Sequence, residues 1–269
     1  MGSASFADLS SPEWASFRNA AIVPLSGKKL AVATSWTGWM PKAGDGMTNH
    51  ISAGAAFSFG KSGLSLGASY MPGHPYDVVY ESGLSGGVFS PADLQANIGY
   101  AFSVNEWLAI GLNGRFLTSK LAPERSYNAF AGDLGAAARF NSITVALGIC
   151  NLGTQVVSND GESYPLAASI SAGAAWQQSF ADIHSVKASL DADYFLAGHF
   201  TAAVGVEYCF NKLVSARAGY HLGTAQSALP SFLSLGVGVQ FAGFALDVSY
   251  ITANEQLGNT ICAGLRYSL

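Results

Sequence analysis

Residues 231–242 read SFLSLGVGVQFA, and neighbouring residues in this stretch alternate in character. One face carries large apolar side chains and the other carries small or polar ones: Leu233, Leu235, Val237 and Val239 against Ser234, Gly236, Gly238 and Gln240. A period of two residues predicts a β-strand whose two faces meet different surroundings. The next two segments, 243–253 and 259–269, repeat the pattern.

The small size of the residues on the polar face indicates what those surroundings are. A strand exposed to water usually carries Lys and Glu there, whereas here Gly, Ala and Ser predominate and the apolar face is unbroken. Only 11% of the residues are charged, against about 25% in ordinary soluble proteins. No stretch approaches the roughly 20 apolar residues of a membrane-spanning helix. The sequence therefore predicts an all-β transmembrane barrel in the bacterial outer membrane, with lipids around its wall.

Turn residues divide 28–269 into fourteen expected strands, an even number of the kind found in single-chain bacterial barrels. Tight links are expected at 60–63, 103–106, 141–142, 180–182, 211–212 and 242–243. Longer links are expected at 40–47, 72–91, 120–129, 153–165, 223–230 and 254–258, with one short exception near Gly198. Short turns face the periplasm in this class, so both termini are expected there.

Residues 1–27 fit no strand and are expected to form a separate N-terminal unit. Ser11-Pro12-Glu13 has the features of a helix start, with a capping hydroxyl, Pro at the first helical position and an acid in the first turn. Pro24 ends the run. We expect a short helical plug inside the lumen, formed around Trp14, Phe17, Arg18 and Asn19.

Charged residues of the expected strands fall on the lumen face. Those assigned to a lumen network are Arg115, Asp133, Arg139, Asp193, Glu207, Arg217, Asp247 and Arg266. Both signs occur on neighbouring strands, for example Glu207 with Arg217 and Asp247 with Arg266. Two interpretations remain open: a salt-bridged lumen that fills itself, or a selective permeation path.

Several strings resemble the PorV/PorQ family of Bacteroidota outer-membrane proteins. They are Ala131-Gly132-Asp133-Leu134-Gly135, the run 145–153, Tyr164-Pro165-Leu166, Gly205-Val206-Glu207-Tyr208, Arg217-Ala218-Gly219-Tyr220, Leu229-Pro230 and Leu246-Asp247. The resemblance spans nearly the whole chain. It implies kinship with the FadL-like barrels, which have fourteen strands and an N-terminal plug.

Two functional hypotheses follow. The first is a non-enzymatic accessory subunit that binds other outer-membrane or surface proteins, in a type IX-like secretion or barrel-assembly machine; it rests on the resemblance and on the apolar outer faces. Its partner-binding loop would be 72–91, with Tyr76, Val79, Tyr80 and Phe89. The alternative is a FadL-type transporter of small hydrophobic molecules. It needs an apolar lumen pocket, whereas the expected lumen residues are small or charged.

An enzyme is the third class considered, and we expect no catalytic residues. The five histidines are spread along the chain, and the strand phase puts His184 and His199 near opposite ends of the barrel. No metal-ligand spacing or cofactor fingerprint occurs, so we expect no metal and no cofactor. The net charge of −4 predicts no nucleic-acid partner. Three cysteines on separate strands predict no disulfide framework. Residues 1–4 lack the features of a signal peptide, so we interpret the sequence as a mature or re-initiated chain.

Overall fold

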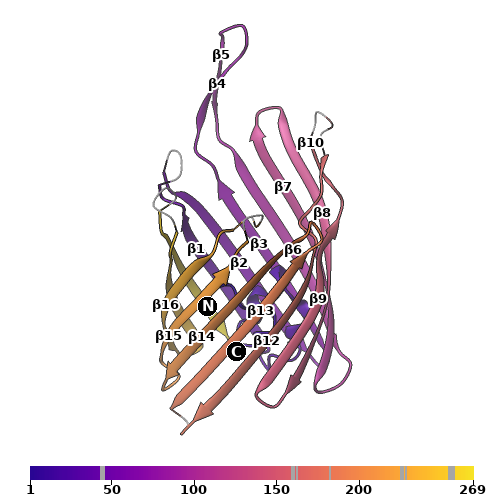
Figure 1. The fold of residues 1–269 in the computed structure, drawn as a ribbon, viewed down its shortest axis with the longest axis vertical. Helices are drawn as coiled ribbons and strands as arrows, with labels where there is room; N and C mark the ends of the chain where they lie inside the picture. Colours follow the sequence, from indigo (N-terminus) through magenta and orange to yellow (C-terminus); the bar gives the residue numbers. More distant parts are fainter. Residues whose placement is uncertain are drawn as a thin grey trace.

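The computed structural model shows a closed antiparallel β-barrel (Figure 1). It describes residues 1–42, 46–158, 161, 163–181, 183–224, 227, 229–253 and 258–269. Within these residues fourteen strands form the wall: β1 Leu30–Trp39, β2 Thr48–Phe59, β3 Ser62–Pro72, β6 Ala92–Ser103, β7 Leu108–Ala122, β8 Arg125–Phe140, β9 Ile143–Gly153, β12 Ser169–Phe180, β13 His184–Phe195, β14 His199–Phe210, β15 Val214–Leu222, β16 Phe232–Phe241, β17 Phe244–Ile251 and β18 Thr260–Ser268. The expected fourteen-stranded barrel is confirmed.

Closure comes from pairing of the first and last strands, from Ala31 opposite Ser268 to Gly38 opposite Ile261. Every wall strand thus has two hydrogen-bonded neighbours, and no long sheet edge is exposed to lipid. No helix in the described part of the chain is long and apolar enough to cross a membrane.

The outer wall carries the apolar faces that the alternation predicts. Leu235, Val237 and Val239 of β16 are about half exposed or more, whereas Ser234 and Gly238 between them are buried toward the lumen. The same phase holds in β6, where Leu94, Ile98, Tyr100 and Phe102 are exposed. A closed barrel with such a wall is an outer-membrane protein, and the expected localisation is confirmed.

Tight turns gather at one end of the barrel. Asn141 and Asn211 take positive φ values of 51° and 52° in two of them, a conformation that Asn tolerates better than most residues. The C-terminal Leu269 and the start of β1 lie at this end. Met1, by contrast, lies inside the lumen against Gly205 and Gly219. We call the tight-turn end the inner end, because short turns face the periplasm in this class.

The opposite end differs from expectation in two links. The link expected at 120–129 is a two-residue turn, because β7 and β8 remain paired as far as Ala122 and Arg125. The link 72–91 is not a loop but a hairpin of β4 (Tyr76–Val79) and β5 (Ser85–Phe89) that stands above the barrel (Figure 1). Short strands β10 (Val156–Ser158) and β11 (Ser163–Tyr164) extend the sheet beside β8. Residues 43–45, 159–160, 162, 225–226, 228 and 254–257 of the expected links, and Asp182 in a turn, lie outside the described residues.

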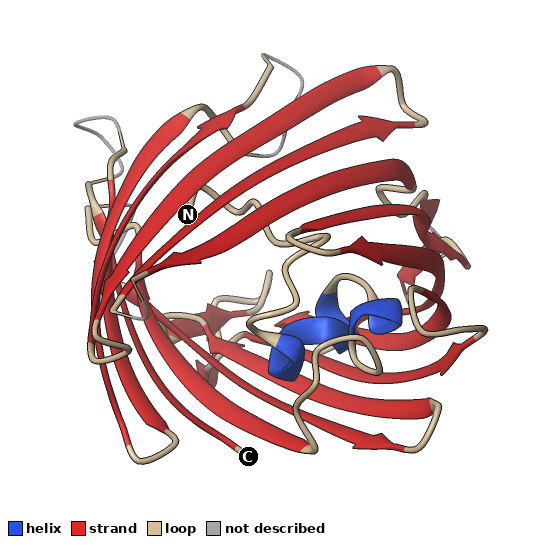
Figure 2. Ribbon diagram, turned by 90° about the horizontal axis from the view of Figure 1, so that it is seen from below, coloured by secondary structure: helices blue, strands red, loops and turns tan. Residues whose placement is uncertain are grey.

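The N-terminal segment, residues 1–27, lies within the ring of strands (Figure 2). The single helix expected there is instead two short 3₁₀ helices, η1 (Pro12–Phe17) and η2 (Ala20–Ile22). Ser11 makes no side-chain cap, and the second helix is capped by Asn19, whose side chain accepts a hydrogen bond from the Ala21 amide. The break at residues 18–19 lets both side chains reach partners in the lumen, as described below.

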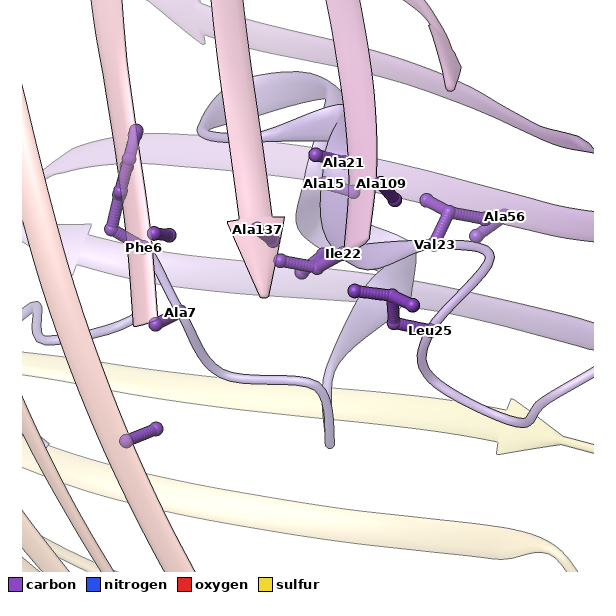
Figure 3. Packing of buried hydrophobic residues seen from close by; sticks show 12 residues of the cluster. Phe6, Ala7, Ala15, Ala21, Ile22, Val23, Leu25, Ala56, Ala109 and Ala137 are labelled. Carbon is purple, nitrogen blue, oxygen red and sulfur yellow. The ribbon is translucent and has the colours of Figure 1, made fainter. Parts of the chain in front are cut away.

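Small residues on the inner wall make room for this segment. An added side chain at most of the inward glycines would collide with it; these glycines are Gly54, Gly63, Gly67, Gly111, Gly135, Gly148, Gly205 and Gly219. Inward alanines complete the contact: Phe6, Ile22, Val23 and Leu25 pack with Ala56, Ala109 and Ala137 of the wall (Figure 3). The glycines and alanines on the inner wall therefore form the surface against which the N-terminal segment packs.

Candidate functional site

An apolar cavity of about 460 Å³ lies in the outer half of the lumen. Its lining comes from wall strands β1, β2, β3, β6, β7 and β8 and from β10, and its apolar side chains on the lumen side are Trp39, Met71, Leu117, Tyr127 and Ala129, with Val156 of β10. Six polar residues also line it, His50, Ser69, Asp93, Gln95, Thr118 and Ser119, but most of its surface is apolar and Ser119 already donates to Asp93. We call this cavity the outer pocket. Its volume falls within the range of ordinary small-molecule sites.

A second cavity of about 450 Å³ adjoins the outer pocket and shares His50, Ser69 and Gln95 with it. Its lining includes Trp14 and Phe17 of η1, whose rings lie 5.8 Å apart. The second cavity thus lies between the outer pocket and the aromatic side chains of the N-terminal segment.

The outer pocket was not found from the sequence. Its signal lies in the alternation itself: near the outer ends of β1, β3, β7 and β8 the lumen positions hold Trp39, Met71, Leu117 and Tyr127 instead of small residues. The expectation that the lumen offers little apolar surface is therefore wrong for its outer half. The same expectation is correct deeper in the lumen, beside the N-terminal segment, where small residues such as glycine line the wall.

Two wall sites hold the N-terminal segment through charged groups. Arg115 lies 3.1 Å from the Asp133 carboxylate and donates to the carbonyl oxygen of Phe17 at 3.2 Å. It also donates to Asn151, at a bulge of β9 where the Asn151 amide bonds Asp133. The wall thus holds the backbone directly behind one of the two rings.

The second wall site is Asp191 on β13. One of its oxygens accepts the amides of Ser5 and Phe6, at 2.7 and 2.8 Å. Arg18 lies 3.3 Å from the same oxygen and 3.7 Å from Asp193. Asn19 does not reach the wall's charges; its amide donates to the carbonyl of Phe6.

Four of the five remaining expected network residues form a chain of ion pairs beside the segment. Arg217 bonds both Glu207 and Asp247, and Arg266 lies 3.7 Å from Asp247. Both expected pairs are thus present. Lys187 extends the chain to Glu207 at 3.6 Å and to Asp8 at 3.1 Å. Arg139 stands apart from this chain and donates to the carbonyl of Leu25.

No pattern in the sequence marks Asp8 as a site residue. The residue is nevertheless buried, with 6% exposed, and it forms a salt bridge with Lys187. Burial by itself raises the pKa of its carboxyl, but the Lys187 ammonium and hydrogen bonds from Ser10 outweigh it, and the pKa lies below its usual value. Glu13 is the opposite case. It is 1% exposed, no other described residue donates a hydrogen bond to its oxygens, and burial raises its pKa.

The expected partner-binding residues lie on the hairpin. Tyr76 and Phe89 pair their rings at 5.7 Å, and the Tyr76 hydroxyl donates to Leu121 of β7. Val79 and Tyr80 are 68% and 52% exposed near the tip. The hairpin therefore presents apolar side chains outside the barrel, well apart from the lumen cavities.

The histidines have separate neighbours. His184 stacks on Tyr208 on the outer wall, His199 on Phe195 and His221 on Phe232, while His50 lies 3.4 Å from Ser52. No group of three metal-ligating side chains occurs among the described residues. All three cysteines are free.

The fold defines a class, a fourteen-stranded outer-membrane β-barrel with its N-terminal segment inside the lumen. No family model and no curated protein matches the sequence. The toluene transporter TodX of Pseudomonas putida is similar in structure, with 13% identity, a TM-score of 0.65, and coverage of 100% of this chain and 97% of that one.

Two further solved structures share the fold. The toluene transporter TbuX of Ralstonia pickettii is 12% identical, with a TM-score of 0.60 and coverage of 95% of this chain and 93% of its own. A FadL homologue of Pseudomonas aeruginosa is 13% identical, with a TM-score of 0.51 and coverage of 99% and 94%. At these identities the likeness shows the fold, and it lends no support to membership of the PorV/PorQ family.

Proposed function

We propose that this protein is an outer-membrane channel that takes up small hydrophobic molecules and binds them first in the outer pocket. The observation that carries the proposal is the outer pocket itself, together with the adjoining second cavity that reaches the rings of Trp14 and Phe17. The proposal replaces the accessory subunit as the first interpretation, because the apolar pocket that transport requires is present.

The chemistry of the outer pocket favours a neutral ligand with one or two rings. Trp39 and Tyr127 offer aromatic surface and Met71 and Leu117 offer aliphatic surface. Two solved relatives in fold are described as toluene transporters, and a mutant of one as a monoaromatic hydrocarbon channel. A ligand of that size suits a cavity of about 460 Å³.

The N-terminal segment would act as the plug of this channel. The rings of Trp14 and Phe17 form the floor of the second cavity. Arg115 binds the backbone of the segment at Phe17, and Asp191 binds it at Phe6. Held in this way, the plug keeps the lumen closed to ions, while an apolar ligand gathers above it.

The test is uptake of toluene by cells that express single-residue variants. Leu117→Gln places an amide in the outer pocket and is expected to reduce uptake at least fivefold. The matched control is Leu121→Gln on the same strand, since Leu121 is 51% exposed and does not line the pocket. Equal uptake by both variants, at equal amounts of folded barrel, would contradict the proposed function.

One observation supports a second function, the accessory subunit of a PorV/PorQ-like secretion or assembly machine. It is the hairpin, whose Val79, Leu84 and Val88 are each about 70% exposed. A surface of this kind suits a partner protein. Co-purification of a larger envelope protein that is lost when residues 74–90 are replaced by a short Gly-Ser link, with toluene uptake retained, would favour this function.

A further inference from the structure

A third cavity, of about 470 Å³, opens at the inner end of the barrel below the N-terminal segment. We call it the inner vestibule. The segment contributes Asp8, Leu9, Ser10 and Ser26 to its lining, and Lys28 follows directly after it in the chain. The inner ends of eight wall strands and the turns between them supply the rest. It is separate from the outer pocket, with which it shares no lining residue.

The charges of the inner vestibule are strongly unbalanced. Five basic side chains line it but only two acidic ones: Lys28, Arg139, Lys187, Lys212 and Arg266 against Asp8 and Glu207. The whole chain, by contrast, has a net charge of −4. Positive charge is therefore concentrated at this end of the lumen.

Both acidic groups are already neutralised. The Lys187 ammonium lies 3.1 Å from the Asp8 carboxylate and 3.6 Å from the Glu207 carboxylate. Glu207 also bonds Arg217 outside the vestibule. Neither carboxylate is left to balance the other cations of the lining.

Three of the other four cations have no salt-bridge partner among the described residues, and the fourth, Arg266, has only a long one. The Lys28 ammonium donates to the carbonyl oxygen of Ser10 at 2.7 Å, and the Arg139 guanidinium donates to that of Leu25 at 3.2 Å. Among the described residues Lys28, Arg139 and Lys212 form no salt bridge, and Arg266 is only 3.7 Å from its partner Asp247. Burial lowers the pKa of the Lys28 amino group, which is a cost that a bound anion would offset.

We propose that the inner vestibule is a binding site for a small organic oxyanion, a carboxylate or phosphate compound entering from the periplasmic side. A charged guanidinium and two ammonium groups supply the strong donors for such a ligand. The Gln177 side chain of the lining adds a neutral amide that can donate to a further oxygen. The volume limits the ligand to small-molecule size.

Isothermal titration of the purified full-length protein with citrate, and separately with pyrophosphate, tests this site. We expect saturable binding of at least one of them, weakened tenfold or more in the double variant Lys28→Gln, Arg139→Gln. The matched control is Lys61→Gln, because Lys61 lies in a turn at the same end but outside the vestibule. Absence of saturable binding to the wild type, or an equal loss in the control, would overturn the proposal.

A second variant separates binding from folding, since Lys28 and Arg139 also hold the N-terminal segment. Lys212 is exposed in a turn at a φ of 53°, which Asn adopts readily. Lys212→Asn is expected to keep the heat-modifiable mobility of the folded barrel and to weaken binding two- to fivefold. Unchanged affinity in both Lys212→Asn and the double variant would show that the vestibule is not the site. Toluene uptake should be unaffected by Lys212→Asn, so this proposal and the proposed function can fail separately.

Discussion

The guanidinium of Arg115 on the wall donates to the backbone carbonyl of Phe17 inside the lumen, at 3.2 Å. Because the Phe17 ring forms part of the floor below the outer pocket, this bond links the barrel wall to the closure of the lumen. Its partner Asp133 has a side chain that is 4% exposed, so the pair is buried.

Loss of this link should loosen the plug. We expect no open-pore current from the wild type in planar bilayers, and measurable current from the double variant Arg115→Met, Asp133→Asn. The second substitution avoids leaving an unpaired buried carboxylate, which would cost about 3–5 kcal/mol. Lys61→Met, at an exposed turn, serves as the control and should remain closed. A double variant as silent as the wild type would show that Arg115 does not secure the plug.

Glu13 should make stability depend on pH. Burial raises the pKa of the Glu13 carboxyl above its ordinary value of 4.5, so folding favours the protonated form. Its favourable contribution is complete below about 4.5 and is lost as pH rises through the raised pKa. Glu13→Gln is therefore expected to stabilise the folded protein increasingly above that pH, and to change little at pH 4. Urea midpoints of the reconstituted barrel at pH 4, 6 and 8 would measure the difference, and a constant difference would contradict the assignment.

The lipid-facing wall should reject charge where the lumen accepts it. Val237 is 61% exposed on the outer wall, and Val237→Arg is expected to destabilise the barrel by about 2–4 kcal/mol near the midplane. Ser249 pairs with Gly236, the neighbour of Val237, and faces the second cavity beside Asp247. Ser249→Arg should cost much less. Similar losses for both variants would show that the two faces are wrongly assigned.

The sidedness of the barrel can be checked by labelling. After replacement of the three native cysteines, Ser82→Cys at the hairpin tip should react with a membrane-impermeant maleimide on intact cells. Asn105→Cys, in the link between β6 and β7, should react only after the outer membrane is opened. The reverse pattern would invert the assignment of inner and outer ends.

Most of the wall strands could be predicted from the sequence, because the alternation that defines each strand lies within a short stretch of residues. Lipid on one side forces an apolar residue at every second position, so Leu233 and Leu235 set the phase of β16 without reference to any other strand. The pairs Glu207–Arg217 and Asp247–Arg266 followed from the same phase on adjacent strands.

The rest depends on contacts between distant residues. Nothing near Asp8 in the sequence indicates that Lys187 lies beside it, and the outer pocket is lined by six wall strands that are distant in sequence. The plug helix was misjudged because its local pattern is helical, whereas Arg18 and Asn19 turn away to bind Asp191 and Phe6. The prediction of a long loop at 120–129 was wrong for a simpler reason. Strands β7 and β8 stay paired almost to their turn, and such pairing can continue beyond the membrane.

The burial of the N-terminal segment also constrains the order in which the protein can assemble. Residues that are synthesised first bond to strands that are synthesised last: the Gly2 amide bonds Ser234 across 232 positions, and that of Ser5 bonds Asp191 across 186. The segment therefore reaches its final contacts only after the strands that carry Asp191 and Ser234 are in place. Contacts this distant in sequence carry a large entropic cost before they form, and they slow folding. The part of the chain that is synthesised first is thus among the last to reach its final position.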